Sequence, residues 1–409
     1  MRIGILSQYF HPEPVVKVNR LALGLTAAGH TVEVLTAIPS WGRGQFYNGY
    51  KRKLIQEEWL GEIRVVRTII WPYLGRVIWK RMLSYGSFGI SALLGSARID
   101  RLDVLYVYHP PLTISLPAYL VSRQQKVPFI YDVQDIWPEA GVAAGAVRPG
   151  ILYKVMLAVA RRVYILAEHV TVIAPEFRDV LVEQGVSPEK ISVVPNWADE
   201  SIYKPQRALT IRQQYGLPED GFLVMYAGTL GSTHGVEYIL EAARLLKKEE
   251  KIFFVFAGSG PEYEKMVQTK EQLGLKNVKF LGFIEPIQRL SDLVCTGDLM
   301  LVHMRRSMSG AVSLPSRMLA YMACARPVLV ASQGAPRRLV EKALCGAVCE
   351  PEDPCEMANT IVDLYRQPSR LEEMGRRGRE TYLSEFSERV VLDRLIKLIE
   401  RVGNHGSTK

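Results

Sequence analysis

The clearest alternation of apolar and polar segments lies between residues 222 and 261. Phe222 to Ala227 is a continuous apolar run, as expected for a strand that is buried on both faces of a parallel sheet. Glycines interrupt it, and apolar residues then return at helical spacing from Val236 to Leu246. A second apolar run, Ile252 to Ala257, ends in the glycine turn 258–261. The pattern predicts a strand, loop, helix, strand unit in which both parallel strands end in glycine turns at one edge of a sheet.

The same alternation of short apolar runs and helical stripes covers most of the chain. In the first half we expect strands at 3–7, 31–36, 63–67, 104–108, 128–132, 169–173 and 191–194, and helices at 15–28, 80–97, 112–124, 150–168 and 175–184. In the second half we expect further strands at 278–281, 298–302 and 327–331. Strands that alternate with helices in this way are typical of α/β domains with parallel sheets.

The domain organisation follows from the length of 409 residues and from one aperiodic segment. The chain is too long for a single core, and residues 195–206 have no periodicity and are bounded by prolines, which indicates a hinge. We therefore predict one domain at 1–196 and a second at 197–384. Residues 385–409 carry an apolar helical stripe and are predicted to form a helix that packs across the domain junction.

Composition excludes several classes of protein. The chain has 48% hydrophobic and 23% charged residues, as in an ordinary globular protein. The apolar run 3–6 at its start is too short for a signal peptide, and five cysteines agree with a reducing compartment, so we expect a cytoplasmic protein. The cysteines at 345, 349 and 355 lack the spacing of a zinc site, and no metal is expected. Prolines and His109 interrupt the uncharged run 104–122, which favours a strand, a turn and a buried helix over a membrane span.

The net charge of +9 is concentrated in residues 43–101, which contain 11 Lys or Arg and 4 Asp or Glu. Aromatic residues are interleaved there with Arg76, Lys80 and Arg81. This mixture suits peripheral contact with an anionic membrane, here the inner membrane face, and it equally suits a solvated helix over a core. No known nucleic-acid-binding module is present, so nucleic acid is not expected as a partner.

Seven short motifs follow one another over almost the whole chain. They are Tyr9-Phe10-His11-Pro12-Glu13, GHTVEVLT at 29–36, Asp135-Ile136-Trp137-Pro138-Glu139, Pro195-Asn196, Gly228-Thr229-Leu230-Gly231, Phe280-Leu281-Gly282-Phe283 and Pro315-Ser316-Arg317. Each motif is weak alone, but the ordered set resembles the family 4 glycosyltransferases. Within that family it is most similar to bacterial O-antigen and capsule enzymes that transfer amino sugars such as N-acetylfucosamine.

The resemblance implies an α/β GT-B fold, with two Rossmann-like domains whose parallel sheets face a central cleft. It also implies a retaining, metal-independent transfer without a cofactor, in which the leaving phosphate accepts the proton of the acceptor hydroxyl. The donor would be a nucleotide sugar, a UDP-sugar favoured, held mainly by the C-terminal domain. The acceptor would be a saccharide or a polyprenyl-linked sugar of cell-surface polysaccharide synthesis, held mainly by the N-terminal domain.

Arg317 is the strongest donor-binding candidate, because it follows Pro315 at a predicted helix start, where a guanidinium and backbone N–H groups can face one anion. A surface arginine at a helix start is the alternative. The full set of donor-binding candidates is Gly228, Thr229, Gly231, His234, Gly258, Gly260, Phe283, Ile284, Arg306, Ser316 and Arg317. The glycines would face the phosphates, whose charge suits a helix N-terminus, although ordinary strand-to-helix turns have the same pattern. Phe283 and Ile284 would border the base.

Three residues that follow N-terminal strands are catalytic candidates. His109 could hydrogen-bond the donor sugar, or it could be a satisfied histidine in a proline-rich turn. Asp135 and Glu139 flank Trp137, as in sites that stack a sugar on an aromatic ring, although Asp135 could equally cap a short helix. Glu13 is the third candidate. No pair of carboxylates has a spacing that argues for a covalent glycosyl intermediate.

The chain departs from the family pattern at several positions. Thr229 and His234 stand where members often carry an arginine and a lysine, and Val312 and Ala320 stand where two glutamates are expected. His234, with Arg305 or Arg306, could supply part of the missing charge. Two alternatives to a transferase therefore stay open: an epimerase or phosphorylase on the same fold, and a non-catalytic binding protein.

Overall fold

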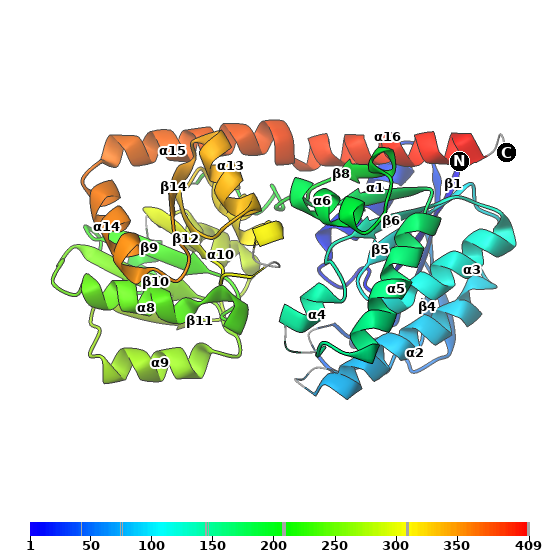
Figure 1. The fold of residues 1–409 in the computed structure, drawn as a ribbon, viewed down its shortest axis with the longest axis horizontal. Coiled ribbons are helices and arrows are strands. Elements are labelled where there is room, and N and C mark those ends of the chain that lie inside the picture. Colours follow the sequence, from blue (N-terminus) through cyan, green and yellow to red (C-terminus); the bar gives the residue numbers. More distant parts are fainter. Residues whose placement is uncertain are drawn as a thin grey trace. The chain divides into compact units, whose positions relative to one another are not determined.

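The chain forms two compact units, each built around its own sheet (Figure 1). The computed structural model describes residues 1–406 apart from 42, 74, 76, 144, 146, 207–209 and 308–310, so Arg76 lies outside the described residues. The first unit comprises Met1–Pro195 together with the chain from Leu392 on, and the second comprises Asn196–Val391.

The first unit contains an eight-stranded sheet in the order β3-β4-β2-β1-β5-β6-β7-β8. Its strands are β1 (Arg2–Ser7), β2 (Thr31–Ala37), β3 (Ile55–Leu60), β4 (Ile63–Thr68), β5 (Val104–His109), β6 (Phe129–Val133), β7 (His169–Val172) and β8 (Ile191–Val193). Neighbouring strands are parallel, except that β3 runs antiparallel to β4. β3 was not predicted, because it is an edge strand whose Glu57 and Glu58 interrupt any apolar run.

Helices cover both faces of this sheet. They are α1 (Val16–Ala27), α2 (Ile78–Ser96), α3 (Ser115–Gln125), α4 (Glu139–Ala143), α5 (Ile151–Leu166) and α6 (Pro175–Glu183). α3 packs between α2 and α5, so these three helices lie side by side (Figure 1). The long last helix, α16 (Glu388–Gly406), places Leu392 and Ile396 against Gly24 of α1. That this helix packs across the domain junction stays a prediction.

A buried ion pair ties the strands of the first unit to α1. The Lys17 ammonium lies 3.1 Å from Oδ2 of Asp132, and the two side chains are 4% and 0% exposed. Asp132 also accepts hydrogen bonds from Tyr106, Thr171 and Gln134, and Lys17 donates to the carbonyl of Val194. The carboxylate therefore has several donors in a buried site, which is the condition for a buried charge to be tolerated.

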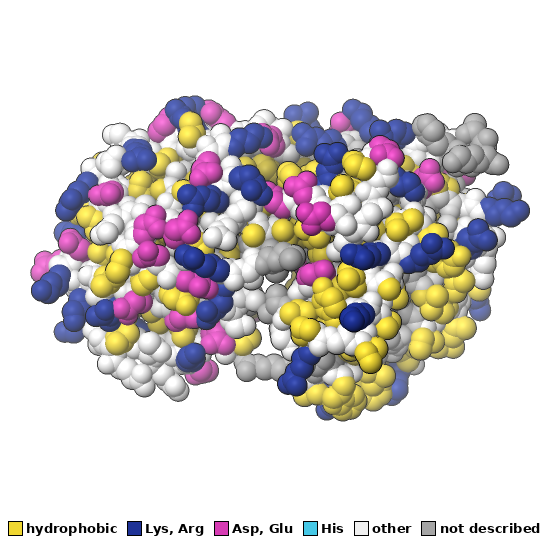
Figure 2. All heavy atoms as spheres, in the orientation of Figure 1, with side chains coloured by type: hydrophobic (Ala, Val, Ile, Leu, Met, Phe, Trp, Pro, Cys, Tyr) yellow, Lys and Arg dark blue, Asp and Glu magenta, His cyan; other side chains and the backbone are white. Residues whose placement is uncertain are grey.

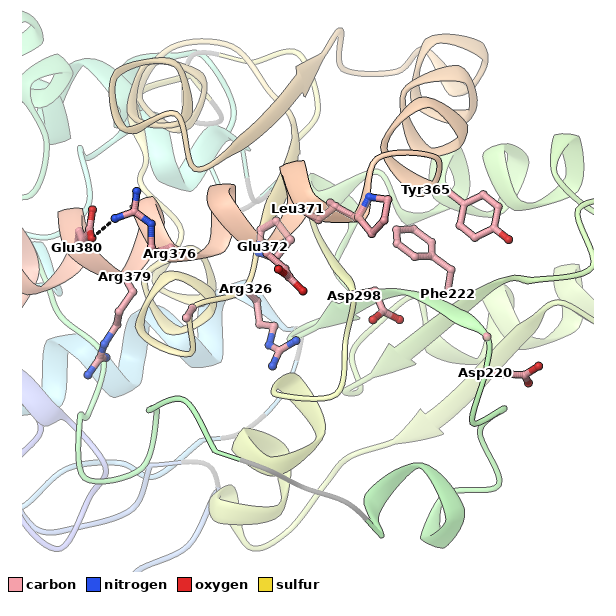
Figure 3. Close-up of a pocket in the computed structure, with 14 residues that line it drawn as sticks. Asp220, Phe222, Asp298, Arg326, Tyr365, Leu371, Glu372, Arg376, Arg379 and Glu380 are labelled. Carbon is pink, nitrogen blue, oxygen red and sulfur yellow. Dashed lines mark hydrogen bonds and ion pairs between the residues drawn. The ribbon is translucent and has the colours of Figure 1, made fainter.

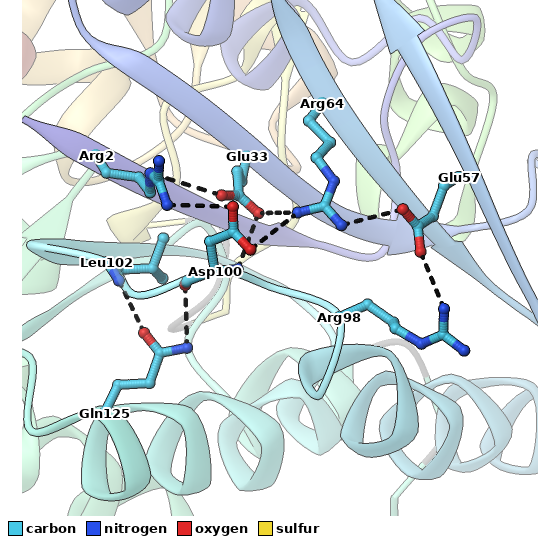
Figure 4. Close-up of polar contacts among 8 residues, drawn as sticks. All are labelled: Arg2, Glu33, Glu57, Arg64, Arg98, Asp100, Leu102 and Gln125. Atoms are coloured by element: carbon cyan, nitrogen blue, oxygen red, sulfur yellow. Dashed lines mark hydrogen bonds and ion pairs between the residues drawn. The ribbon is translucent and has the colours of Figure 1, made fainter.

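A second group of ion pairs lies where β2, β3 and β4 meet (Figure 4). Arg64 of β4 bridges Glu33 of β2 and Glu57 of β3, at 3.1 and 3.0 Å. Arg98 pairs with Glu57 as well, and Arg2 pairs with Asp100. Several cations of the basic region 43–101 are thus neutralised within the protein.

The second unit contains a six-stranded parallel sheet in the order β11-β10-β9-β12-β13-β14. Its strands are β9 (Phe222–Ala227), β10 (Ile252–Ala257), β11 (Val278–Gly282), β12 (Leu299–His303), β13 (Val328–Ala331) and β14 (Gly346–Cys349). Its helices are α7 (Ile211–Gln214), α8 (Val236–Leu245), α9 (Tyr263–Gln272), α10 (Ile287–Val294), α12 (Ser316–Ala323), α13 (Ala335–Ala343), α14 (Pro354–Tyr365) and α15 (Pro368–Thr381).

The apolar run in β9 is explained by burial on both faces of this sheet. Phe222, Val224 and Tyr226 belong to one core, together with residues of α8, α9 and α14. Leu223, Met225 and Ala227 belong to the other core, with residues of α10, α12 and α13. Because alternate residues of a strand point to opposite faces, both sets must be apolar. The predicted strand, loop, helix, strand unit thus forms the centre of the second unit.

Candidate functional site

Two glycine turns lie side by side at the carboxyl edge of the second sheet. The Gly228 N–H donates to the carbonyl of Ala257 at 2.8 Å, and the Leu230 N–H donates to that of Ser259 at 3.0 Å. A Cβ on Gly258 would lie 2.0 Å from the Gly228 carbonyl oxygen, and φ is +144° at this residue. The turns therefore need glycine in order to pack against each other, and the N–H of Gly228 is already used within the protein.

Arg317 lies against this pair of turns. It is the second residue of α12, and its guanidinium stacks on the Tyr226 ring with Cζ 4.6 Å from the ring centroid. A Cβ on Gly228 would lie 3.2 Å from that Cζ, so the arginine packs directly on the glycine. Its Nη1 is buried without a hydrogen-bond partner, and none of the described acidic side chains forms an ion pair with it. An unpaired guanidinium nitrogen at a strand edge is suited to receive an anion.

His234 stands between Arg317 and the first turn. Its Nε2 lies 2.9 Å from Nη2 of Arg317, and its Nδ1 lies 3.3 Å from the N–H nitrogen of Gly231. A neutral imidazole has only one acceptor nitrogen, so it cannot accept both hydrogen bonds. Burial, the Arg317 cation and His303 lower the pKa of His234 to about 3. The ring is therefore neutral in the free protein, and one of the two donors facing it lacks a full partner.

His303, at the end of β12, contacts the backbone of His234. Its Nδ1 lies 2.9 Å from the carbonyl oxygen of His234, and its Nε2 accepts from the N–H of Glu352 at 3.2 Å. Its ring stacks on Tyr238 at 5.6 Å, and burial lowers its pKa to about 4. His303 was not among the predicted site residues, because an isolated histidine in a buried strand carries no recognisable signal.

The remaining donor-binding candidates differ in their exposure and in whether they are paired within the protein. Arg306 lies 3.6 Å from Glu350 and donates to the carbonyl of Pro351, and Arg305 is paired with Glu237, so both cations have partners within the protein. Thr229 and Ser316 are exposed next to Gly228 and Arg317. Phe283 is 69% exposed, as a residue that borders a ligand can be, whereas Ile284 lies in a core.

The carboxyl edge of the first sheet carries the three catalytic candidates: Glu13 follows β1, His109 is the last residue of β5, and Asp135 follows β6. Glu13 is buried, and its Oε1 accepts hydrogen bonds from the N–H groups of Ser40 and Trp41, both at 2.8 Å. Its Oε2 accepts from the N–H of Phe10 at 3.2 Å. Desolvation raises the pKa of Glu13 although these hydrogen bonds oppose it. The carboxylate of Glu13 thus holds two loops together at this edge.

His109 is completely buried, and both of its ring nitrogens lack a hydrogen-bond partner. Burial lowers its pKa to about 3. In the segment after the neighbouring strand, Nε1 of Trp137 and Oε2 of Glu139 are also buried without partners. Asp135 lies in the same segment and is exposed. Unsatisfied buried polar atoms are rare in proteins, so their concentration at one sheet edge is typical of a site that binds a polar ligand.

A cavity of about 920 Å³ lies at the opposite edge of the second sheet (Figure 3). It is lined by Phe222, the first residue of β9, and by Asp298 and Pro327, which directly precede β12 and β13. Ligands of parallel α/β sheets bind at the carboxyl ends of strands, so this cavity is distinct from the candidate site.

The described residues contain neither a cluster of metal ligands nor a membrane-spanning helix. No group of three or more His, Cys, Asp or Glu side chains among them could hold a metal ion. No helix in the described part of the chain combines the length and apolar character needed to cross a bilayer.

Two family models together match most of the chain. The model described as "Glycosyl transferase 4-like domain" matches residues 14–197, and the model described as "Glycosyl transferases group 1" matches residues 208–381. These matches identify the chain as a glycosyltransferase, an enzyme that transfers sugars in glycan biosynthesis. It belongs to family 4 of the glycosyltransferases and has the GT-B fold.

Individual relatives agree with this assignment. The chain is 27% identical over 305 residues, 72% of its length and 73% of the relative's, to WcaI of Escherichia coli strain K12, which is provisionally assigned as a colanic acid biosynthesis glycosyl transferase. It is 25% identical over 309 residues, 72% of its length and 71% of the relative's, to D-inositol 3-phosphate glycosyltransferase 1 of Catenulispora acidiphila.

Solved structures show the same fold at lower identity. The sucrose-phosphate synthase of Thermosynechococcus elongatus superposes with a TM-score of 0.76 at 18% identity, over 98% of this chain and 99% of the other. HepE of Anabaena, in complex with UDP, superposes with a TM-score of 0.72 at 17% identity, over 98% of this chain and all of the other.

Proposed function

We propose that this glycosyltransferase is a retaining, metal-independent enzyme that takes a sugar, an amino sugar by resemblance, from a nucleoside diphosphate donor, with UDP-sugars favoured. The acceptor would be a saccharide or a lipid-linked sugar of cell-surface polysaccharide synthesis. The bond between the anomeric carbon and the diphosphate breaks, the new glycosidic bond forms on the same face, and the acceptor proton passes to a phosphate oxygen. The free thiols of all five cysteines support a reducing, cytoplasmic location.

The observation that carries the proposal is the unpaired guanidinium of Arg317 beside the glycine turn of β9. Negative charge grows on a diphosphate as it leaves, and a fixed cation stabilises that charge most where water is scarce. Arg317 is held by Tyr226 and His234 rather than by a carboxylate, so its charge is not neutralised within the described protein. The unpartnered atoms of His109, Trp137 and Glu139 in the other unit would hydrogen-bond sugar hydroxyls.

A first experiment measures UDP affinity by isothermal titration calorimetry for the wild type, Arg317→Ala and the control Arg244→Ala. Arg244 lies on α8 in an exposed pair with Glu241. We expect Arg317→Ala to weaken binding by about 10- to 150-fold, the effect of a hydrogen bond to a charged group. Arg244→Ala should bind as the wild type does. Equal affinity of all three proteins would refute the role of Arg317.

A second measurement uses the neutral state of His234. Burial is the main cause of the low pKa of His234, so the ring should stay neutral between pH 5.5 and 7.5 even when an anion offsets the Arg317 charge. Affinity for a UDP-sugar should therefore be the same at pH 7.5 and at pH 5.5. A higher affinity at pH 5.5 that His234→Asn abolishes would show that the ring takes up a proton and would contradict this reasoning.

The products decide between the proposed activity and its alternatives. A new glycoside from a panel of UDP-, GDP- and dTDP-sugars, detected by mass spectrometry with the anomeric configuration of the donor, supports a retaining transfer. An isomerised nucleotide sugar would indicate an epimerase, and a sugar phosphate would indicate a phosphorylase. Activity that survives EDTA supports metal independence. Binding without turnover of any donor would indicate a non-catalytic protein.

A further inference from the structure

The outer surface of the helices α2, α3 and α5 is unusually apolar. Figure 2 shows hydrophobic side chains gathered over α2 and α5. Nine large apolar side chains are between 42% and 83% exposed: Trp79, Leu83, Ile90, Leu94, Leu116, Ile151, Leu152, Val155 and Val159. Because the three helices lie side by side, these residues form one surface, which we call the α2–α3–α5 face. Soluble monomers rarely expose a large contiguous apolar surface unless it binds something.

These helices also bury an apolar stripe against the sheet. α2 buries Phe88 and Ala92, and α5 buries Ala160, Val163 and Tyr164. The exposed apolar residues therefore add to the core-facing stripe and do not replace it. The first two turns of α5 carry Ile151, Leu152 and Val155 on the outside, where a helix of a soluble protein usually carries charge. A helix that is apolar on both sides requires a second apolar environment.

The charges of the three helices all have one sign. α2, α3 and α5 contain no Asp or Glu. Their cations are Lys80, Arg81, Arg123, Lys154, Arg161 and Arg162. Basic residues interleaved with tryptophan, leucine and isoleucine match the two layers of a membrane surface, where anionic headgroups lie over acyl chains.

We propose that the α2–α3–α5 face docks on the surface of an anionic lipid bilayer, with its apolar side chains among the headgroups and its cations on the phosphates. A second copy of the chain fits the same face poorly, because a two-fold contact of the face with itself would bring cations onto cations. A bilayer accepts both the apolar side chains and the cations. Trp79 has the amphipathic ring that favours the boundary between headgroups and acyl chains.

The face differs from the basic region 43–101 of the sequence analysis. α2 belongs to both, but α3 and α5 lie outside that region. The Arg64 and Arg98 cations of the region are neutralised by Glu33, Glu57 and their neighbours (Figure 4). The docking surface is therefore set by the packing of α2 beside α3 and α5, and the local excess of basic residues in the sequence is only part of it.

The experiment is co-sedimentation with vesicles of phosphatidylcholine alone or of phosphatidylcholine mixed with phosphatidylglycerol, without donor. Trp79→Glu is paired with Trp59→Glu, because Trp59 is 66% exposed on β3 and Trp79 is 64% exposed on α2. Leu152→Glu is paired with Leu344→Glu, whose leucines are 60% and 55% exposed. We expect the wild type to bind the mixed vesicles and the two face variants to lose about tenfold or more of that binding, while both controls keep it.

The charge contribution is tested separately with Lys154→Glu and Arg162→Glu. Each removes a cation and adds an anion, so each should weaken binding to mixed vesicles by about 5- to 30-fold and should leave the weak binding to pure phosphatidylcholine unchanged. The proposal is overturned if the wild type does not bind mixed vesicles, or if Trp79→Glu binds as Trp59→Glu does. A concentration-dependent dimer that Trp79→Glu abolishes, without vesicle binding, would overturn it in favour of a second copy.

Vesicle binding is independent of the proposed transfer reaction. UDP affinity measured on the same variants should stay at the wild-type value, which also shows that they are folded. Loss of UDP binding in Arg317→Ala with intact vesicle binding supports both proposals. Absence of vesicle binding with normal UDP affinity would refute the docking surface alone.

Discussion

Acidification should destabilise this protein through histidines that are buried in the neutral form. His109 is fully buried in the first unit, and burial lowers its pKa to about 3. His303 is 1% exposed in the second unit, and burial lowers its pKa to about 4. His169 and His234 are shifted in the same direction, to about 4 and about 3. Each unit therefore contains two histidines that resist protonation while it is folded.

The sign and size of the effect follow from proton linkage. The pKa of a histidine in the unfolded chain is about 6.5. At pH values well above this, the histidines are neutral in both the folded and the unfolded state and do not affect the free energy of unfolding. As the pH falls from there toward the folded pKa values of about 3 and 4, the unfolded chain binds protons that the folded chain does not, so stability is lost over this window. Between pH 7.5 and 5.5 each fully buried histidine should remove about 1.4 kcal/mol. The loss from His109 should appear in the unfolding transition of the first unit.

Urea unfolding followed by tryptophan fluorescence at pH 7.5 and 5.5 measures this loss. His109→Leu removes the titrating ring and keeps a side chain suited to a buried site. We expect it to lose about 1.4 kcal/mol less than the wild type between the two pH values. His11→Leu, which removes an exposed histidine, is the control and should keep the wild-type loss. An equal loss in the wild type and in His109→Leu would refute the reasoning.

Two further predictions concern residues that stabilise the fold of each unit. Lys17→Met leaves the Asp132 carboxylate buried without its cation, so it should cost about 3–5 kcal/mol of unfolding free energy in a urea titration; a loss below about 1 kcal/mol would show that the pair is dispensable. Gly258→Ala places a Cβ 2.0 Å from the Gly228 carbonyl oxygen, so it should lower the thermal midpoint and weaken UDP binding. Gly274→Ala is the matched control, since φ is +61° there and no atom lies within 4 Å of the added Cβ; if both variants behave alike, backbone strain rather than contact between the two turns explains the effect.

The sequence predicted best those elements whose burial is continuous. β9 and β10 are central strands with both faces covered. Every residue of Phe222–Ala227 and Ile252–Ala257 must therefore be apolar or small, and the two strands can be recognised in the sequence as apolar runs. β3 is different, because this edge strand carries Glu57 and Glu58 on opposite faces: Glu57 is exposed and pairs with Arg64, and Glu58 is partly buried. β14 (Gly346–Cys349) was also missed, since four residues with a glycine and a cysteine show no period.

The candidate site was only partly predictable for a different reason. The glycine turns and Arg317 are recognisable because each is a local motif. What surrounds them is not local: Arg317 meets His234 from 83 positions away, and Lys17 meets Asp132 from 115 positions away. Such pairs arise only when parallel strands bring their carboxyl ends together, and a single sequence does not show which loops then touch.

The α2–α3–α5 face shows which sequence signal separates an exposed apolar stripe from a buried one. α8 has a strong apolar stripe that is buried in the core from Val236 to Ala243, and Glu237, Glu241 and Arg244 lie outside this stripe. α5 has apolar residues at comparable density but no acidic residue, and its cations stand among exposed isoleucine, leucine and valine. Water solvates acidic and basic side chains equally well, so a helix that faces water has no reason to exclude one sign. The exclusion of acidic residues from three neighbouring helices therefore points to a negatively charged surface, and this signal is present in the amino-acid sequence itself.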